Sequence, residues 1–231
     1  MARELDSYLR KLQSRLAACE AKLGIVAADG SDDDEDAGPT PQLIEFDEFL
    51  KANLDPFVAA ADAIGGAGPA LGDIVKRGFQ QNRRFIELAG KHKKPAPPVL
   101  QGLMAETSKI CKEAGDLFDR ASPFANHIKA ISDGLPALQW VIIEPMPLEI
   151  VNSYNEAQDF YANKVRMEYR SKDAKHVEFV NAFKALLTAL AAYVKKNYKT
   201  GLEWNGRGSV LSDAGAAAGG AGGGGGGGGG G

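Results

Sequence analysis

The sequence predicts an all-α protein, a six-helix antiparallel bundle preceded by a short oligomerising coiled-coil helix. Three observations favour this class. From residue 43 onward, apolar residues recur at intervals of three and four positions, with no convincing strand pattern. Clusters of glycine and proline interrupt these stretches, as the short loops of a bundle do. In residues 1–24, leucines follow the a and d positions of heptads.

The composition is that of an ordinary protein with one substantial core, since 44% of its 231 residues are hydrophobic and 25% are charged. A net charge of −3 argues against a nucleic-acid binder, which needs a basic surface. Cys19 and Cys111 lie in separate expected helices without CxxC spacing, which predicts a reduced, cytoplasmic protein. No stretch approaches about 18 consecutive apolar residues, so we expect no membrane span, and the charged first residues do not form a signal peptide.

The first helix is expected over residues 1–24. Its apolar positions are spaced 4, 3, 4, 3 and 4 apart, and they are Leu5, Leu9, Leu12, Leu16, Cys19 and Leu23. One amphipathic helix of this length is marginal in water, so its apolar stripe must be covered. Self-association through residues 1–24 into a homo-oligomer is the sharper interpretation, and packing onto the main bundle is the alternative. Heptad rules do not decide between two and four strands here.

An acidic flexible linker is expected over residues 25–41, because it contains the run Asp32 to Asp36 and almost no core-forming residues. A helix on such a tether is well placed to pair with its copies. The folded helical domain is expected over residues 42–206. Residues 207–231 form a Gly/Ala-rich linker or tail, since positions 215–231 hold only glycine and alanine.

Six helices are expected within the folded domain. They cover about 43–64, 69–90, 98–119, 123–142, 147–170 and 173–198. Pro56 predicts a kink or a restart in the first. For the fourth helix, Ser122 is a typical amino-terminal cap and Pro123 a typical first residue. For the sixth helix, Asp173 is a typical amino-terminal cap. The stretch from Gly201 to Val210 is expected to pack back through Leu202 and Trp204.

No pattern in the sequence predicts catalysis, so we expect no enzyme, no cofactor and no metal. The glycines of residues 65–68 lack the Lys-Ser/Thr pair of a phosphate loop. Three histidines, His92, His127 and His176, are scattered and give no metal-binding face. The aromatic residues at helical spacing beside aliphatic ones are expected in the core, among them Trp140, Phe160, Tyr161 and Phe179.

Basic residues gather towards the end of the domain. Residues 163–199 carry nine Lys or Arg against three acidic residues. This excess is either a binding face for an acidic partner or the solvated side of two amphipathic helices, and the pattern alone favours the solvated side. Reasoning from the residues therefore reaches an oligomerising helical bundle.

The segment 160–179, FYANKVRMEYRSKDAKHVEF, closely resembles the signature of cyclase-associated proteins, which reads approximately FY-N-K/R-V-x-x-E-Y-K/R-x-K-D-x-x-H-V-E/D-W. Further matches follow the family's order, and they are the leucine-rich first helix, Phe79-Gln80-Gln81, Lys93-Lys94-Pro95, Leu138-Gln139-Trp140 and residues 201–205. Phe179 stands where the family has tryptophan, an aromatic exchange that should leave packing nearly intact.

The resemblance implies a cytoplasmic, cytoskeleton-associated scaffold that binds actin filaments decorated with cofilin and promotes their depolymerisation at pointed ends. The family's actin-monomer segments (proline-rich region, WH2 motif and β-sheet domain) do not occur in this sequence. The exposed polar members of the matched segments are candidates for the actin face, and they are Lys93, Lys94, Asn163, Lys164, Glu168, Arg170, Lys172, Asp173 and His176.

The alternative is a signalling scaffold that binds adenylyl cyclase or another partner without a direct role on actin. The family's first helix repeats an Arg-Leu-Glu pattern associated with the cyclase. Here the nearest match is Arg15-Leu16-Ala17, with Glu20 displaced, so the cyclase belongs only to this alternative.

Overall fold

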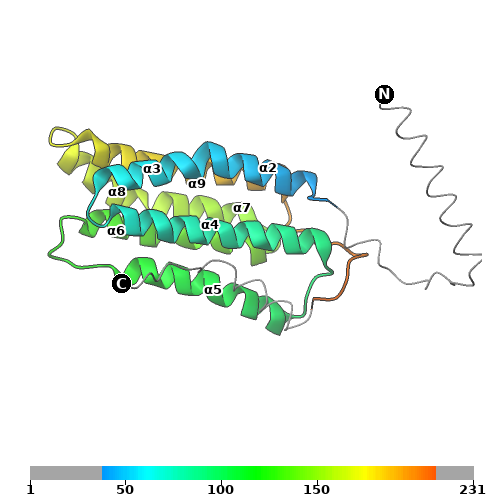
Figure 1. Cartoon of the computed structure of the whole chain (residues 1–231). Helices are drawn as coiled ribbons and strands as arrows, with labels where there is room; N and C mark the ends of the chain where they lie inside the picture. Colours follow the sequence, from blue (N-terminus) through cyan, green and yellow to red (C-terminus); the bar gives the residue numbers. More distant parts are fainter. Residues whose placement is uncertain (1–37, 212–231) are drawn as a thin grey trace, which may run out of the picture. The chain divides into compact units, whose positions relative to one another are not determined.

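The structure, a computed structural model, describes residues 38–211. Six helical segments lie side by side in it (Figure 1), and the prediction of an all-α bundle is confirmed. In chain order they are α2 (Pro41–Phe49), the π-helix η1 (Leu50–Leu54) and α3 (Asp55–Ile64); α4 (Gly68–Lys91); α5 (Pro97–Asp116); α6 (Ala125–Gly134) with the 3-10 helix η2 (Leu135–Ile142); α7 (Pro147–Ala157) with α8 (Asp159–Tyr169); and α9 (Ala174–Asn197). The predicted coiled-coil helix, most of the predicted linker and the Gly/Ala tail lie outside the described residues.

The first segment shows how the chain accommodates Pro56, where the sequence predicts a kink or a restart: the backbone stays helical from α2 through η1 into α3. Thr40 caps α2, because its hydroxyl accepts a hydrogen bond from the Leu43 amide at 3.2 Å. A proline in a helix has no amide proton to give to the preceding turn. The backbone widens into η1 just before Pro56, and the side-chain amide of Asn53 donates to the Phe49 carbonyl at 3.0 Å.

Helix α9 is the central element of the core, and it packs against α3, α7 and α8. Its length and composition would also let it cross a membrane, and it is the one helix of the described residues to which this applies. Here its apolar side is covered by the bundle. The ring of Phe57 from α3, for example, lies 5.4 Å from that of Phe179 and 5.5 Å from that of Phe183.

A buried polar contact fixes η2 against α4. The Trp140 indole donates to the side-chain oxygen of Asn82 at 2.6 Å, and the Asn82 amide donates to the Leu138 carbonyl at 2.9 Å. Both Asn82 and Trp140 are fully buried. Because each polar group of this pair has a partner, the pair satisfies the general requirement for polar groups in a core.

Several predicted helix limits are wrong. The third helix ends at Asp116, not near 119, and Leu117 and Phe118 are exposed in the turn that follows. The fourth begins at Ala125, because Ser122 forms a turn in which its hydroxyl accepts from the Phe124 amide at 3.1 Å. Beyond Gly134 this helix continues as a 3-10 helix with a proline near its start.

The segment after α9 returns to the bundle, as predicted. Leu202 is buried and Trp204 is half-buried, and the Asn205 amide donates to the Ala89 carbonyl at 2.8 Å. Packing continues past the predicted domain end at residue 206, because Leu211 is also buried. The segment therefore lies against the end of α4.

Candidate functional site

The segment that carries the resemblance forms α8, the turn after it and the first turn of α9. Along α8, Ala162 and Val165 are fully buried and Tyr169 is half-buried. Phe160, Lys164 and Met167 follow the same period on the opposite side of the helix, and all three are exposed. We call these three residues the α8 outer face.

The α8 outer face combines apolar and basic groups. The side chain of Phe160 is 62% exposed and that of Met167 is 75% exposed. The Lys164 ammonium lies 4.3 Å from the centre of the Phe160 ring and 4.8 Å from that of Tyr161, which are cation–π distances. No ion pair to a described carboxylate accompanies Lys164. Large exposed apolar groups around an unneutralised cation are features of a protein-binding surface.

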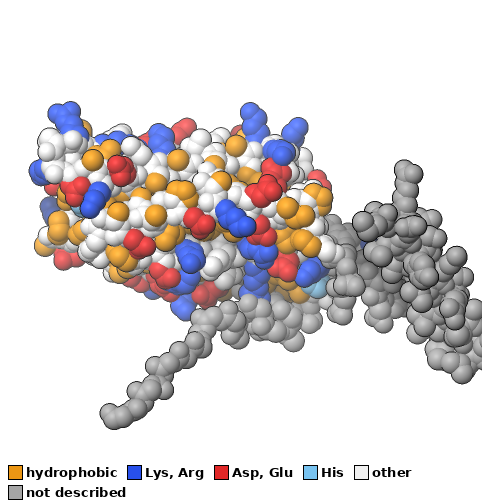
Figure 2. Space-filling model, turned by 45° about the horizontal axis from the view of Figure 1, so that its top comes forward, with side chains coloured by type: hydrophobic (Ala, Val, Ile, Leu, Met, Phe, Trp, Pro, Cys, Tyr) orange, Lys and Arg blue, Asp and Glu red, His pale blue; other side chains and the backbone are white. Residues whose placement is uncertain are grey.

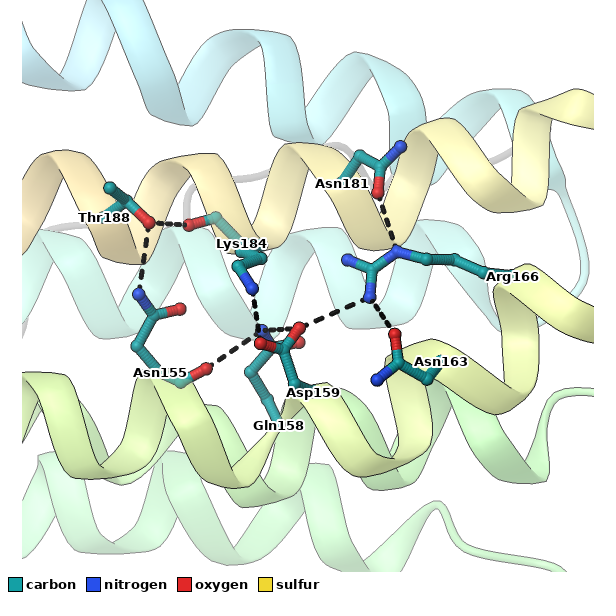
Figure 3. Close-up of polar contacts among 8 residues, drawn as sticks. All are labelled: Asn155, Gln158, Asp159, Asn163, Arg166, Asn181, Lys184 and Thr188. Carbon is teal, nitrogen blue, oxygen red and sulfur yellow. Dashed lines mark hydrogen bonds and ion pairs between the residues drawn. The ribbon is translucent and has the colours of Figure 1, made fainter.

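Asn163 supports this helix from one side. Its side-chain oxygen accepts from the Arg166 guanidinium at 2.7 Å (Figure 3), and Arg166 also reaches Asn181 of α9 at 2.9 Å. The same guanidinium lies 3.3 Å from Asp159, which is paired with Lys184 as well. Asn163 therefore belongs to a polar network between α8 and α9.

The carboxylate of Asp159 is the centre of that network. Burial raises the pKa of Asp159, but the hydrogen bonds from Lys184 and Arg166 outweigh this effect and hold the pKa below its usual value. Gln158 lies fully buried beside it and donates to the Asn155 carbonyl at 3.1 Å (Figure 3). The network joins α7, α8 and α9, so its role is to hold the outer face of α8 in place.

Three further candidates make contacts within the turn between α8 and α9. Glu168 and Lys172 pair with each other at 3.5 Å, one helical turn apart. Asp173 caps α9, as predicted, because its carboxylate accepts from the Lys175 amide at 3.0 Å. Arg170 is exposed and forms no ion pair among the described residues.

His176 is buried, so its selection as an exposed polar residue is wrong. Its ring stacks on Tyr169 with a 3.9 Å separation of ring centres. Its Nδ1 lies 2.8 Å from Nε2 of His127, for which the sequence pattern indicates no partner. The pair links α6 to α9 at the end of the bundle that carries the turn.

Burial acts on both imidazoles. It lowers the pKa of His127 to about 4, with His176 as a smaller cause, and it lowers the pKa of His176 against the opposing effects of Asp173 and Glu168. Nδ1 of His127 has no described partner. An unpaired acceptor is less costly than an unpaired N–H. We therefore assign the proton to Nε2 of His127, which donates to His176.

The remaining candidates, Lys93 and Lys94, lie at the other end of the bundle. The start of α4 is near the turn, because Gly66 lies against the Phe124 ring and that ring is 5.8 Å from His176. Helix α4 then runs for 24 residues, or about 36 Å, before the chain reaches Lys93 (Figure 1). The predicted residues therefore form two separate groups.

Phe160 is exposed, so its predicted place in the core is wrong, and Met167, which no prediction singled out, is exposed as well. Ala162 and Val165 define the buried stripe of α8. Phe160 and Met167 lie on the opposite side of the helix from this stripe, which identifies both as exposed. Figure 2 shows that basic and acidic side chains are interspersed on the face of the bundle turned to the viewer. Basic side chains therefore do not form one continuous patch on that face.

The described residues contain no group of three or more His, Cys, Asp or Glu that could hold a metal ion. Cys111 is half-buried, and burial raises the pKa of its thiol to about 11, so the thiol is neutral at pH 7.

Comparison with known proteins gives one consistent family. The sequence matches the family described as "CAP, N-terminal domain" over residues 46–202. It is 33% identical over 214 residues to the adenylyl cyclase-associated protein of Hydra viridissima, and 32% identical over 185 residues to adenylyl cyclase-associated protein 1 of Homo sapiens. These alignments cover 90% and 79% of this chain but 44% and 39% of the relatives, so the chain spans less than half of their length.

Solved structures agree with this assignment. A crystal structure of the N-terminal domain of CAP, described as indicating variable oligomerisation, aligns with a TM-score of 0.71 at 28% identity and covers 75% of this chain and 96% of its own. The N-terminal domain of the adenylyl cyclase-associated protein from Dictyostelium discoideum aligns with a TM-score of 0.69 at 26% identity, covering 73% of this chain and 97% of its own.

Proposed function

This chain belongs to the CAP N-terminal domain family, and on that premise we propose that it is an actin-regulating scaffold that binds cofilin-decorated filaments and promotes their depolymerisation at pointed ends. The observation that carries the proposal is the α8 outer face, where Phe160 and Met167 are exposed around Lys164. These residues belong to the segment that resembles the family signature. Arg170 in the following turn is exposed and adds positive charge, whereas the charge of Lys172 is balanced by Glu168.

The chemistry of this face suits an acidic protein surface. Apolar side chains that become buried on contact supply affinity, whereas exposed cations mainly raise the association rate and select the partner. Exposed charges are screened by salt, so the proposed binding weakens as ionic strength rises. The activity needs no covalent bond to be made or broken. Binding at the terminal actin subunit of a filament would weaken the contacts of that subunit with the next one.

The leucine stripe of residues 1–24 would supply valency in this proposal. Several bundles joined in one homo-oligomer raise the local concentration of binding faces at a filament end. A mass measurement in solution tests this part, because the full chain should be an oligomer and a chain without residues 1–24 should be a monomer. If the number of chains per particle does not change on deletion, the coiled-coil interpretation is refuted.

A second candidate is a signalling scaffold that binds adenylyl cyclase, which the shared name of the relatives favours. It predicts that the chain has no effect on filaments.

A single-filament assay with and without cofilin tests the main proposal. The chain should accelerate pointed-end shortening of cofilin-decorated filaments, and Lys164→Glu and Met167→Ala should each reduce the effect. The controls change the same chemistry elsewhere on the surface, and they are Lys109→Glu on α5 and Val210→Ala, which is 78% exposed. Pointed-end shortening that is the same with and without the purified chain would refute the proposal.

The proposed localisation has a separate test. In cell extracts the chain should sediment with filamentous actin and should move to the soluble fraction when the filaments are depolymerised. Sedimentation that does not depend on filaments would contradict a cytoskeletal role.

A further inference from the structure

A groove lies along α5, next to the end of η2. Helix α5 is at the edge of the bundle in Figure 1. It has a volume of about 730 Å³ and is mainly apolar. The residues that shape it are Pro97, Leu100, Met104, Ala105 and Ser108 of α5, with Ile142 from the end of η2. We call it the α5 groove. It lies away from the α8 outer face and plays no part in the function proposed above.

Charge is confined to one end of the groove. Lys94 is the only charged residue that lines it, and exposed Lys93 directly precedes Lys94. Lys94 is paired with Glu144 at 2.7 Å, but both side chains are about half exposed. Such a pair contributes little to stability, so Lys94 can exchange Glu144 for a carboxylate of a partner. Lys93 forms no ion pair among the described residues. The groove therefore offers an apolar channel with cations at its Pro97 end.

The shape of the groove fits a helix. From Pro97 to Ser108, α5 rises about 16 Å, which corresponds to three turns of a partner helix. Ala105 and Ser108 are small and exposed, so another helix can approach closely there. Met104 is buried, so the accessible apolar surface of the groove comes mainly from Pro97, Leu100 and Ile142.

Other modes of peptide recognition lack their parts here. Addition of a strand needs an open sheet edge, and residues 38–211 form no strand. Recognition of a proline-rich segment uses a groove lined by aromatic rings, and recognition of a phosphate uses clustered arginines. Neither residue type lines the α5 groove.

We propose that the α5 groove is a docking site for an amphipathic helix of a partner protein, which buries an apolar stripe against Pro97, Leu100 and Ile142 and sets carboxylates against Lys93 and Lys94. This assigns the two lysines to a second interaction, independent of the α8 outer face. One chain could then hold two partners at once.

Binding of a designed peptide to the full chain tests the proposal. The probes are two labelled helical peptides of about 15 residues, with leucine at positions i, i+3, i+4 and i+7 and three glutamates in either the first or the last turn. Fluorescence anisotropy should show saturable binding of one of the two that weakens with added salt. The same peptide with lysine in place of glutamate should bind at least about tenfold more weakly.

Variants of the chain locate the binding. Ala105→Arg and Ser108→Arg fill the groove and should each weaken the acidic peptide at least about tenfold. The double change K93E/K94E should weaken it about tenfold. The matched control is Ala157→Arg at an exposed position of α7, which should bind as the unchanged chain does. Circular dichroism melting of each variant establishes that the bundle remains folded.

Three outcomes overturn the proposal. The first is the absence of saturable binding for both acidic peptides, and the second is binding that is unchanged in Ala105→Arg and Ser108→Arg. The third is a smaller oligomer of the chain in Ala105→Arg, because that result would make the groove a contact between two copies.

Discussion

Acidification from pH 7 to pH 5 is expected to destabilise the bundle through His127. In the folded protein, burial keeps this imidazole neutral down to about pH 4, whereas in the unfolded chain it takes up a proton near its ordinary pKa of 6.5. The unfolded state therefore binds more protons between these values. Stability is complete above pH 6.5, is lost as the pH falls, and reaches its full loss below about pH 4.

The size of the effect follows from the two pKa values. The complete difference corresponds to about 3 kcal/mol, and the part lost between pH 7 and pH 5 is about 2 kcal/mol. His176 adds to it in the same direction, because burial lowers its pKa too. In a bundle whose total stability lies between about 5 and 15 kcal/mol, such a loss is readily measured.

Urea denaturation at pH 7 and pH 5 measures this loss of stability. Carboxylates of the chain also contribute to the loss, so a variant that lacks His127 is needed to isolate the part due to this residue. In His127→Gln an amide replaces the imidazole as donor to His176 without titrating, so the loss between the two pH values should shrink by about 2 kcal/mol. Tyr169→Phe is the control. It removes the hydroxyl that donates to the Pro123 carbonyl at 3.3 Å and should shift stability equally at both pH values. If His127→Gln and the unchanged chain lose the same stability, the reasoning from burial is refuted.

Further substitutions test the packing of the core and the cap of α9. Asn82→Ala leaves the buried Trp140 indole N–H without an acceptor, so it should lower the free energy of unfolding by about 3 kcal/mol. Urea denaturation measures this, and a loss below about 1 kcal/mol would contradict the prediction. Gly134→Ala places a methyl carbon 2.6 Å from a buried ring and should cost about 1–3 kcal/mol, while Gly102→Ala, in open space on α5, should stabilise by up to about 1 kcal/mol. A melting experiment in which both alanines act alike would argue against this packing. Asp173→Ala removes the cap of α9 and should cost about 1 kcal/mol, whereas Asp173→Asn should restore most of it.

Local patterns were enough to predict the helices of this bundle. Pro56 marked an irregularity in the first segment, which the structure shows as a π-helix, and Asp173 marked the start of the last segment, because a missing amide proton and a capping carboxylate act within one turn of the chain. The limits that were wrong depend on contacts from further away. Helix α6 starts at Ala125, two residues after the position that Ser122-Pro123 indicates, because Ser122 forms a turn instead.

The candidate site was less accessible to sequence reasoning. The exposure of Phe160 depends on which side of α8 faces the core, and its helical spacing is equally compatible with either side. The contact between His127 and His176 joins residues 49 positions apart, so no local pattern indicates it. The separation of Lys93 from Lys164 likewise depends on the direction of α4, which the motifs do not encode.

Both ends of the described chain meet at one end of the bundle. Thr40, which precedes α2, lies beside Gly90, and the segment that closes the domain donates from Asn205 to Ala89 and accepts at Ser209 from Lys93. A chain that continues from residue 38 or from residue 211 therefore departs from the far side of the turn between α8 and α9.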